Sequence, residues 1–158
     1  MGNLTLDQAS TIIDAAIKKG RELGFLPLTV AVLDSGGHLV AFKREDESGI
    51  LRPQVAIGKA WGSLGMGVPS RTLRDNLADR PSFVNSLSVA SGGRFIPVPG
   101  GVLIYNQEQK IIGAVGISGD TSEKDEYCAI EGVKAAGLPS NPATPDPNWA
   151  GSTLGPCR

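Results

Sequence analysis

Residues 113–132 read GAVGISGDTSEKDEYCAIEG, and this stretch decides the fold because an apolar β-type run leads directly into a helical pattern. A turn rich in glycine, serine and aspartate joins the two parts. Residues 29–44, TVAVLDSGGHLVAFKR, carry a turn of similar composition between two apolar runs. Backbone N–H groups at a strand-to-helix junction are free to bind an anion or a polar ligand. We therefore expect any functional site to lie near these two glycine turns.

Two β-hairpins are predicted around these stretches. The first pairs Leu28–Leu33 with His38–Lys43, and the second pairs Val102–Tyr105 with Lys110–Ile117. A fifth strand is a candidate at Arg94–Val98, which is apolar but contains a proline.

Helical periodicity fills the rest of the chain. Thr5 and Gln8 have the spacing of a capping box, which opens a helix that ends near Gly24. Further helices are expected from Pro53 through Leu64, from Ser70 through Leu77 and over Glu123–Ala136, with mixed helix and loop over Pro81–Ser91. Helices that are segregated around two hairpins indicate an α+β fold with a largely antiparallel sheet.

Three glycines interrupt the helix predicted from Pro53. Gly58, Gly62 and Gly65 recur at intervals of three to four, so they share one face, where another backbone can approach closely.

The chain is expected to form a single domain over residues 1–138 and an extended tail over 139–158. The tail is rich in proline and has little periodicity. Trp149 is a large aromatic residue on this arm, and such residues are usually buried against something. We therefore expect the tail to lie across a neighbouring subunit.

Composition excludes several classes of protein. With 15 basic and 16 acidic residues the net charge is −1, which argues against nucleic acid or a membrane as the main partner. No export signal or long apolar run is visible, so a cytoplasmic location is expected. Free thiols are favoured over a disulfide between Cys128 and Cys157. One histidine in the whole chain excludes a His-rich site within one subunit, and no metal site is expected.

Lys59 and Asp125 are the first candidates for catalysis. Lys59 lies inside an apolar helical stretch, where a lysine can neutralise a carboxylate or act as a base when desolvated. Its alternative role is structural, with a packed stem and an amine that reaches solvent or a structural carboxylate. Asp125 can serve as a catalytic acid or base, or it can form a buried pair with Lys59.

His38, Arg44 and Arg52 are further candidates. His38 can act as a general base or a ligand, or it can simply bond to the backbone of its hairpin. Arg44 and Arg52 can each grip a carboxylate with two parallel hydrogen bonds, or belong to a solvated charged loop.

The glycine turns supply candidate ligand-binding residues. Gly100 and Gly101 precede a strand, where they permit unusual backbone angles and leave room for a ligand. Ser118 and Gly119 belong to the loop before the last helix, whose N–H groups favour an anion, although Asp120 or Ser122 can cap that helix instead.

Four segments in the same order resemble the GlcG/HbpS family, often described as haem-degrading-like. They are VAVLDSGGHLVAFKRED from residue 30, VAIGKAWGSL from residue 55, PGGVLI from residue 99 and the stretch at 113–132. The resemblance covers residues 4–138. It implies a profilin-like α/β sandwich built on a five-stranded antiparallel sheet. It also implies homo-oligomers, commonly dimers that assemble into rings or octamers.

The resemblance also implies that haem or a corrinoid is a candidate ligand. Some haem-binding members carry a histidine on the first helix, but here the stretch reads AAIKKGREL, with Lys18 and Lys19 in its place. This departure weakens the case for axial haem ligation from that helix. Tyr105, Tyr127 and Met66 are the other conceivable ligands.

Two functional hypotheses remain open. The first is a small-ligand binding protein whose ligand is anionic, with haem or another tetrapyrrole as the leading case. The second is an enzyme that acts on a small carboxylate-bearing metabolite, in which Lys59 and Arg44 hold the anion and His38 or Asp125 moves a proton. The binding hypothesis is preferred because no nucleophile–base pair is visible in the sequence.

Overall fold

The computed structural model describes residues 3–155, and its centre is a five-stranded sheet in which every neighbouring pair is antiparallel. The strands are β1 (Thr29–Asp34), β2 (Leu39–Arg44), β3 (Gly101–Tyr105), β4 (Ile111–Ser118) and β5 (Ser140–Asn141). Their order across the sheet is β2-β1-β4-β3-β5. The α+β class and the five-stranded antiparallel sheet predicted above are confirmed.

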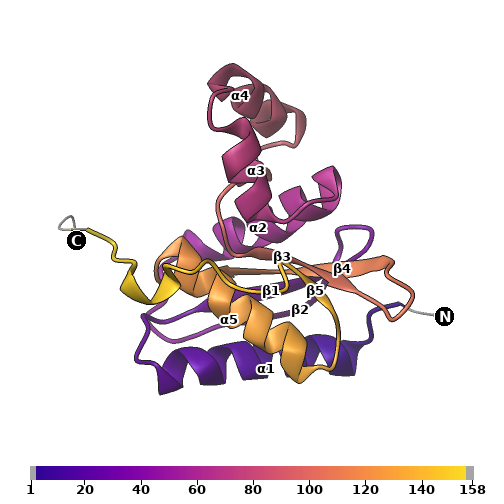
Figure 1. Cartoon of the computed structure of the whole chain (residues 1–158), viewed down its shortest axis with the longest axis vertical. Helices are drawn as coiled ribbons and strands as arrows, with labels where there is room; N and C mark the ends of the chain where they lie inside the picture. The colour runs from indigo at the N-terminus through magenta and orange to yellow at the C-terminus, as the bar shows by residue number, and fades with distance from the viewer. Residues whose placement is uncertain (1–2, 156–158) are drawn as a thin grey trace.

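Helices cover both faces of this sheet. They are α1 (Leu6–Glu22), α2 (Arg52–Met66), α3 (Ser70–Leu77), α4 (Pro81–Ala90) and α5 (Ser122–Ala135), followed by a short 3₁₀ turn, η1 (Trp149–Gly151). Figure 1 shows α1 and α5 on one face, α2 on the other, and α3 and α4 projecting beyond α2. None of the helices in residues 3–155 is long and apolar enough to cross a membrane.

The two faces of the sheet are packed differently. On the α1/α5 side, large aliphatic residues such as Ile12, Val30 and Ile130 form the main core. On the α2 side Leu33 and Leu103 alternate with small residues such as Ala114 and Gly116. A Cβ at Gly116 would overlap the Ala56 carbonyl oxygen, so backbone packs on backbone there. Helix α2 can therefore lie very close to the sheet.

The fifth strand is not the one that the sequence predicted. Arg94–Val98 forms no strand, and Ser140–Asn141 from the tail pairs with β3 instead. Pro97 lacks the N–H that a strand ladder needs. The segment packs against α2, where Ile96 and Phe95 fill the space beside Gly58 and Gly62. The close approach predicted for this glycine face is thereby confirmed at those two positions.

Helix α4 is a regular helix where a mixture of helix and loop was predicted. None of its residues is fully buried. Its half-buried residues Phe83, Val84 and Leu87 pack on a small separate core formed by Leu73, Leu77 and Phe95. The α3–α4 arm is therefore held to the body mainly by this satellite cluster.

The tail folds back onto its own chain, so a packing partner for Trp149, which was the reason to expect the tail across a neighbouring subunit, is present within the subunit. The Trp149 ring stacks on the Tyr127 ring, with centroids 3.9 Å apart and planes 8° from parallel. It also meets the edge of Phe25 at 6.1 Å. The aromatic residue on the arm is thus partly buried against the same subunit, mainly against α5.

Candidate functional site

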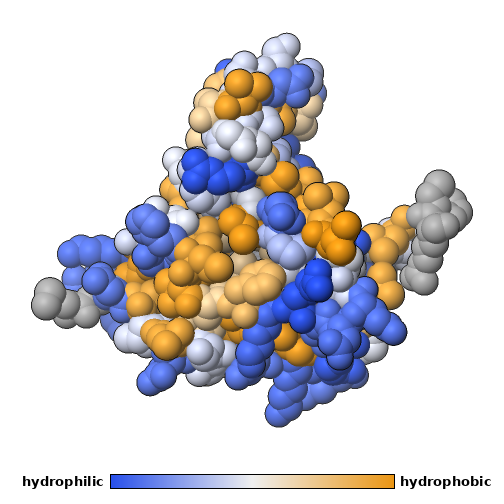
Figure 2. All heavy atoms as spheres, turned by 180° about the vertical axis from the view of Figure 1, so that it is seen from behind, coloured by the Kyte–Doolittle hydropathy of each residue, from blue (hydrophilic) through white to orange (hydrophobic). Residues whose placement is uncertain are grey.

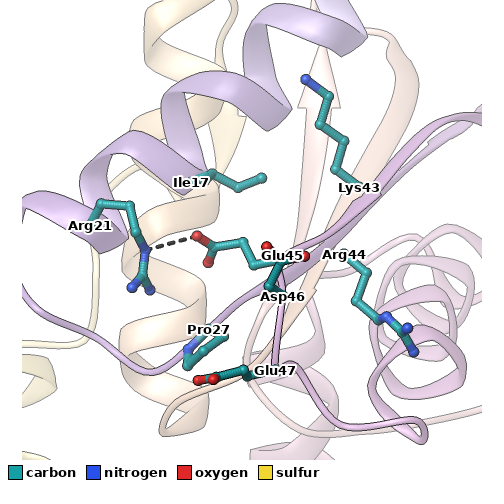
Figure 3. Close-up of a pocket in the computed structure, with 8 residues that line it drawn as sticks. All are labelled: Ile17, Arg21, Pro27, Lys43, Arg44, Glu45, Asp46 and Glu47. Atoms are coloured by element: carbon teal, nitrogen blue, oxygen red, sulfur yellow. Dashed lines mark ion pairs between the residues drawn. The ribbon is translucent and has the colours of Figure 1, made fainter.

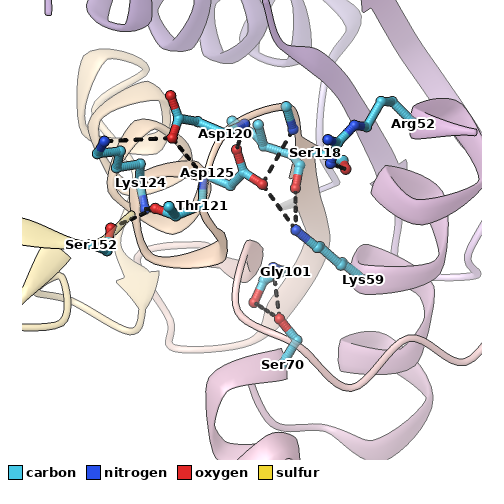
Figure 4. Close-up of polar contacts among 12 residues, drawn as sticks. Arg52, Lys59, Ser70, Gly101, Ser118, Asp120, Thr121, Lys124, Asp125 and Ser152 are labelled. Atoms are coloured by element: carbon cyan, nitrogen blue, oxygen red, sulfur yellow. Dashed lines mark hydrogen bonds and ion pairs between the residues drawn. The ribbon is translucent and has the colours of Figure 1, made fainter. Parts of the chain in front are cut away.

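An ion pair between Lys59 and Asp125 lies at the end of β4. The Lys59 Nζ donates to Asp125 Oδ2 at 3.1 Å and to the carbonyl oxygen of Ile117 at 2.8 Å. The two side chains are 2% and 1% exposed. Because Lys59 belongs to α2 and Asp125 to α5, the pair connects the helices on opposite faces of the sheet (Figure 4).

The backbone N–H groups of the glycine turn are already occupied. Asp125 accepts hydrogen bonds from the N–H groups of Gly119 at 3.3 Å and Asp120 at 3.0 Å. Thr121, rather than Asp120 or Ser122, caps α5 by accepting from the N–H of Lys124. The anion that the junction was predicted to bind is therefore the carboxylate of the chain itself.

Burial and hydrogen bonding act in opposite directions on Asp125. Desolvation raises the pKa of its carboxyl above the ordinary value. The Lys59 ammonium and the two backbone N–H groups oppose that rise. Removing either charge would leave the other buried and uncompensated, which is costly.

Gly100 and Gly101 make room for Lys59. Gly100 has a φ of +117°, and a Cβ there would lie 2.9 Å from Lys59 Nζ. A Cβ at Gly101 would overlap the Lys59 carbonyl oxygen, and the Gly101 N–H donates to Ser70 Oγ at 2.7 Å. Both glycines thus permit close packing of α2 against the start of β3.

Arg52 and Ser118 complete this cluster. Arg52 Nη1 donates to Ser118 Oγ at 3.1 Å, and the arginine is half-buried. The structure therefore brings together seven of the predicted site residues, namely Arg52, Lys59, Gly100, Gly101, Ser118, Gly119 and Asp125.

His38 lies at the opposite end of the sheet. In the β1–β4 register Thr29 pairs with Ser118 and Asp34 with Gly113, so the first hairpin turn and the α5 junction are about 17 Å apart along the strands. The His38 side chain is 81% exposed, and its Nδ1 is 3.2 Å from Asp34 Oδ1. Its backbone N–H is the main group that lowers the pKa of Asp34. The two glycine turns do not share one site.

Arg44 lies in an open, charged hollow between α1 and the end of β2 (Figure 3). Arg21 Nε bonds Glu45 Oε1 at 2.8 Å there, and Glu45 Oε2 accepts from the Leu28 N–H at 2.6 Å. Figure 3 shows the Arg44 side chain pointing away from this pair. Arg44 is exposed and stands two strands from β4, so it does not join Lys59.

Sequence reasoning missed an apolar cleft between α2 and α4. The cleft has a volume of about 200 Å³, and its walls include Trp61, Gly62, Gly65, Met66, Leu87 and Phe95. The Arg94 guanidinium lies 4.4 Å from the centre of the Trp61 ring, and Arg94 Nε donates to the carbonyl of Ser91, which also lines the cleft. A cation therefore stands at the edge of an aromatic-walled hollow. The glycine spacing on α2 indicated a face on which another segment can pack closely. Nothing in the sequence indicated that α4 folds back over this face.

Sequence reasoning also missed Glu126, which follows Asp125 on α5. Its side chain is fully buried, and within residues 3–155 neither carboxyl oxygen has a hydrogen-bond partner. Arg71 Nε on α3 is 3.4 Å from Glu126 Oε2.

Comparison with known proteins places this architecture among relatives. The family model described as haem degrading protein HbpS-like matches residues 4–134. A 15.0 kDa uncharacterised protein of Citrobacter freundii, from the dhaT-dhaS intergenic region, is 27% identical over 130 residues, which cover 82% of this chain and 89% of the relative.

Solved structures have the same fold. The complex of PduOC with haem superposes with a TM-score of 0.78 at 22% identity, covering 87% of this chain and 97% of that one. Protein ORFY of Klebsiella pneumoniae superposes with a TM-score of 0.77 at 26% identity, covering 87% of this chain and 93% of that one. Because the family model matches most of its length, the chain belongs to the HbpS-like family.

Proposed function

We propose that this protein binds a flat, largely apolar small molecule that carries carboxylate groups, and that haem or another tetrapyrrole is the leading case. The observation that carries the proposal is the cleft between α2 and α4, with Arg94 stacked over Trp61 at its edge. Ligand sites are typically concave and apolar, with a few polar groups that fix orientation.

The chemistry of the cleft suits such a ligand. Trp61 is partly exposed and offers an aromatic surface to a planar molecule, while the edge of the nearly buried Phe95 closes the floor of the cleft. Gly62 and Gly65 add no side chain to the part of the α2 wall between Trp61 and Met66. Arg94 presents a planar guanidinium that can hold a carboxylate through two parallel hydrogen bonds. An apolar body and an anionic edge are therefore both accommodated.

The residues at the cleft fit one edge of a haem group. Met66 lines the cleft, is 42% exposed and carries a thioether, which is an axial ligand type for haem iron. Trp61 would contact the macrocycle and Arg94 a propionate. When bound, haem supplies an iron centre that takes axial ligands and changes redox state. The family description and the haem complex of PduOC support this ligand class.

The arrangement does not favour the alternative of an enzyme that uses Lys59 and Arg44. The Lys59 ammonium is already bonded to Asp125 and to a carbonyl, away from solvent. Arg44 and His38, the other residues of that hypothesis, lie elsewhere on the surface.

We also propose that the protein forms homo-oligomers. The support is the projecting arm, on which Val89 is 82% exposed and no residue of α4 is fully buried. Figure 2 shows apolar surface on the arm and on the body below it. Native mass spectrometry of the full chain measures the subunit number and any retained ligand together.

Haemin titration tests the ligand proposal. In a Trp149→Phe background Trp61 is the remaining tryptophan, so quenching of its emission gives a second, independent record of haemin binding to the protein. We expect a Soret band and Trp61 quenching that saturate together at a defined stoichiometry. A Soret band that rises linearly without saturating, or no band at all, contradicts the tetrapyrrole proposal.

A further inference from the structure

The tail forms a strap, defined here as residues 140–152, across α5 and beside α3. Arg71 Nη2 on α3 donates to the Thr144 carbonyl at 3.0 Å. Trp149 stacks on Tyr127, and Ser152 Oγ lies 2.6 Å from Thr121 Oγ1 (Figure 4). At its start, β5 pairs with β3 at the edge of the sheet. The strap is therefore fixed at four points.

Glu126 lies beneath the middle of this strap. Its carboxyl is fully buried, and neither oxygen completes a hydrogen bond with any residue of 3–155. Arg71 connects Glu126 to the strap, because its Nε is 3.4 Å from Glu126 Oε2 while its Nη2 holds Thr144. A buried carboxyl without hydrogen bonds is costly when it is ionised. The burial of Glu126 therefore needs an explanation beyond stability.

The charges around Glu126 come from α3 and from the strap. Arg71 and Arg74 favour the ionised form, whereas the carboxylate of Asp146 on the strap disfavours it. The backbone N–H of Asp146 also faces the carboxyl and, like the two arginines, favours the ionised form. Burial outweighs the two arginines and raises the pKa of Glu126 to about 7.

We propose that the strap is a pH-dependent cover over the Tyr127 face of α5, docked while Glu126 is protonated and released as Glu126 ionises. Ionisation places a second negative charge under Asp146 and demands solvation that only an open strap allows. Opening exposes the Tyr127 ring and the Thr121 hydroxyl. This inference does not depend on the ligand proposed for the α2–α4 cleft.

Linkage gives the size of the effect. A carboxyl whose pKa is about 7 when the strap is docked and 4.5 when it is open shifts the docking equilibrium by up to about 300-fold between acid and alkaline pH. The docked form is favoured at low pH.

Amide hydrogen exchange tests the proposal even when the open form is rare. The N–H of Trp149 is bonded to Asp146 and that of Ser152 to Trp149, so both bonds close a short turn within the strap. A turn this short is not stable away from the surface that it packs on, so both amides lose protection when the strap opens. Corrected for intrinsic rates, we expect their protection factors to fall at least about tenfold between about pH 5.5 and about pH 8.5. They should also stay well below the protection of the Val115 amide in β4, because the opening is local.

Two variants decide the cause. Glu126→Gln should remove the pH dependence of strap protection, while the control Glu131→Gln, on the same helix and ion-paired with Lys134, should retain it. If Glu126→Gln does not fold, Asp146→Asn takes its place and should move the transition to lower pH. Protection that is independent of pH in the natural chain overturns the proposal. So does an unchanged transition in Glu126→Gln, or equal protection of the strap and Val115.

Discussion

Lys59 Nζ lies 3.1 Å from Asp125 Oδ2, and the bond joins α2 to α5 across the end of the sheet. Neither side chain reaches solvent. The sequence indicates these two residues as candidate catalytic groups. In the structure they form a buried ion pair that connects the two helical layers.

Lys59→Met should destabilise the fold, because it strands Asp125 as a buried and uncompensated charge. We expect a loss of about 3–5 kcal/mol in the free energy of unfolding, which urea denaturation measures. Lys59→Met combined with Asp125→Asn should recover part of that loss, since no buried charge is then left alone.

Lys43→Met is the matched control. Lys43 pairs with Asp14 on the surface, with side chains 58% and 60% exposed, so the change should cost less than about 1 kcal/mol. Equal effects at Lys43 and Lys59 would show that the buried pair is not a structural joint.

Gly116→Ala should destabilise the protein by about 1–3 kcal/mol, because the new Cβ overlaps the Ala56 carbonyl and forces α2 away from the sheet. Gly65→Ala is the comparison, since its Cβ meets only Trp61 at 3.8 Å and should leave stability within about 1 kcal/mol. Thermal unfolding of both variants checks this, and a neutral Gly116→Ala would contradict the backbone-on-backbone contact.

Stability should fall as pH rises through neutrality, because the pKa of Glu126 is raised to about 7 in the folded chain from 4.5. The stabilisation of the protonated carboxyl is complete below about pH 4.5 and is lost as pH passes about 7. Glu126→Gln should remove a pH-dependent loss of about 2 kcal/mol between about pH 5 and about pH 8. Urea unfolding at both pH values measures it, and parallel curves for both proteins would contradict the assignment.

Cys128 should resist thiol reagents in the folded protein. It is fully buried, and desolvation raises the pKa of its thiol far above the ordinary value. Mass spectrometry after labelling should find Cys128 unmodified until the chain is unfolded by urea. Rapid native labelling at this position would contradict the packing of α5. Cys157 lies outside the described residues.

Local patterns were enough to predict the two hairpins and the α+β class. Short apolar runs bounded by turn residues marked β1, β3 and β4, and alternation marked β2. The Thr5–Gln8 capping box is present in the structure as predicted. The buried Lys59–Asp125 pair was one of two alternatives that the sequence left open. The apolar residues around Lys59 in its helix were the feature of the sequence that indicated a buried lysine.

The predictions that failed were those that depend on how distant segments of the chain are arranged in space. Two paired residues, Ser140 and Asn141, are too few to give a strand pattern, and the expected Arg94–Val98 strand packs on α2. The expected meeting of the two glycine turns failed because β1 and β4 run antiparallel, which sends the turns that follow them to opposite ends of the sheet. The cleft depends on α4 folding back, which no local pattern encodes.

The location of the ligand site is tested most directly by filling the cleft. Gly65 lines it, and a side chain there projects into open space, so Gly65→Leu should fold normally while occupying the hollow. Gln54→Leu adds the same side chain at an exposed position elsewhere on α2. In parallel haemin titrations followed by the Soret band, we expect Gly65→Leu to weaken binding by more than about tenfold and Gln54→Leu to leave it unchanged. Equal haemin affinity in Gly65→Leu and the natural chain would contradict binding between α2 and α4.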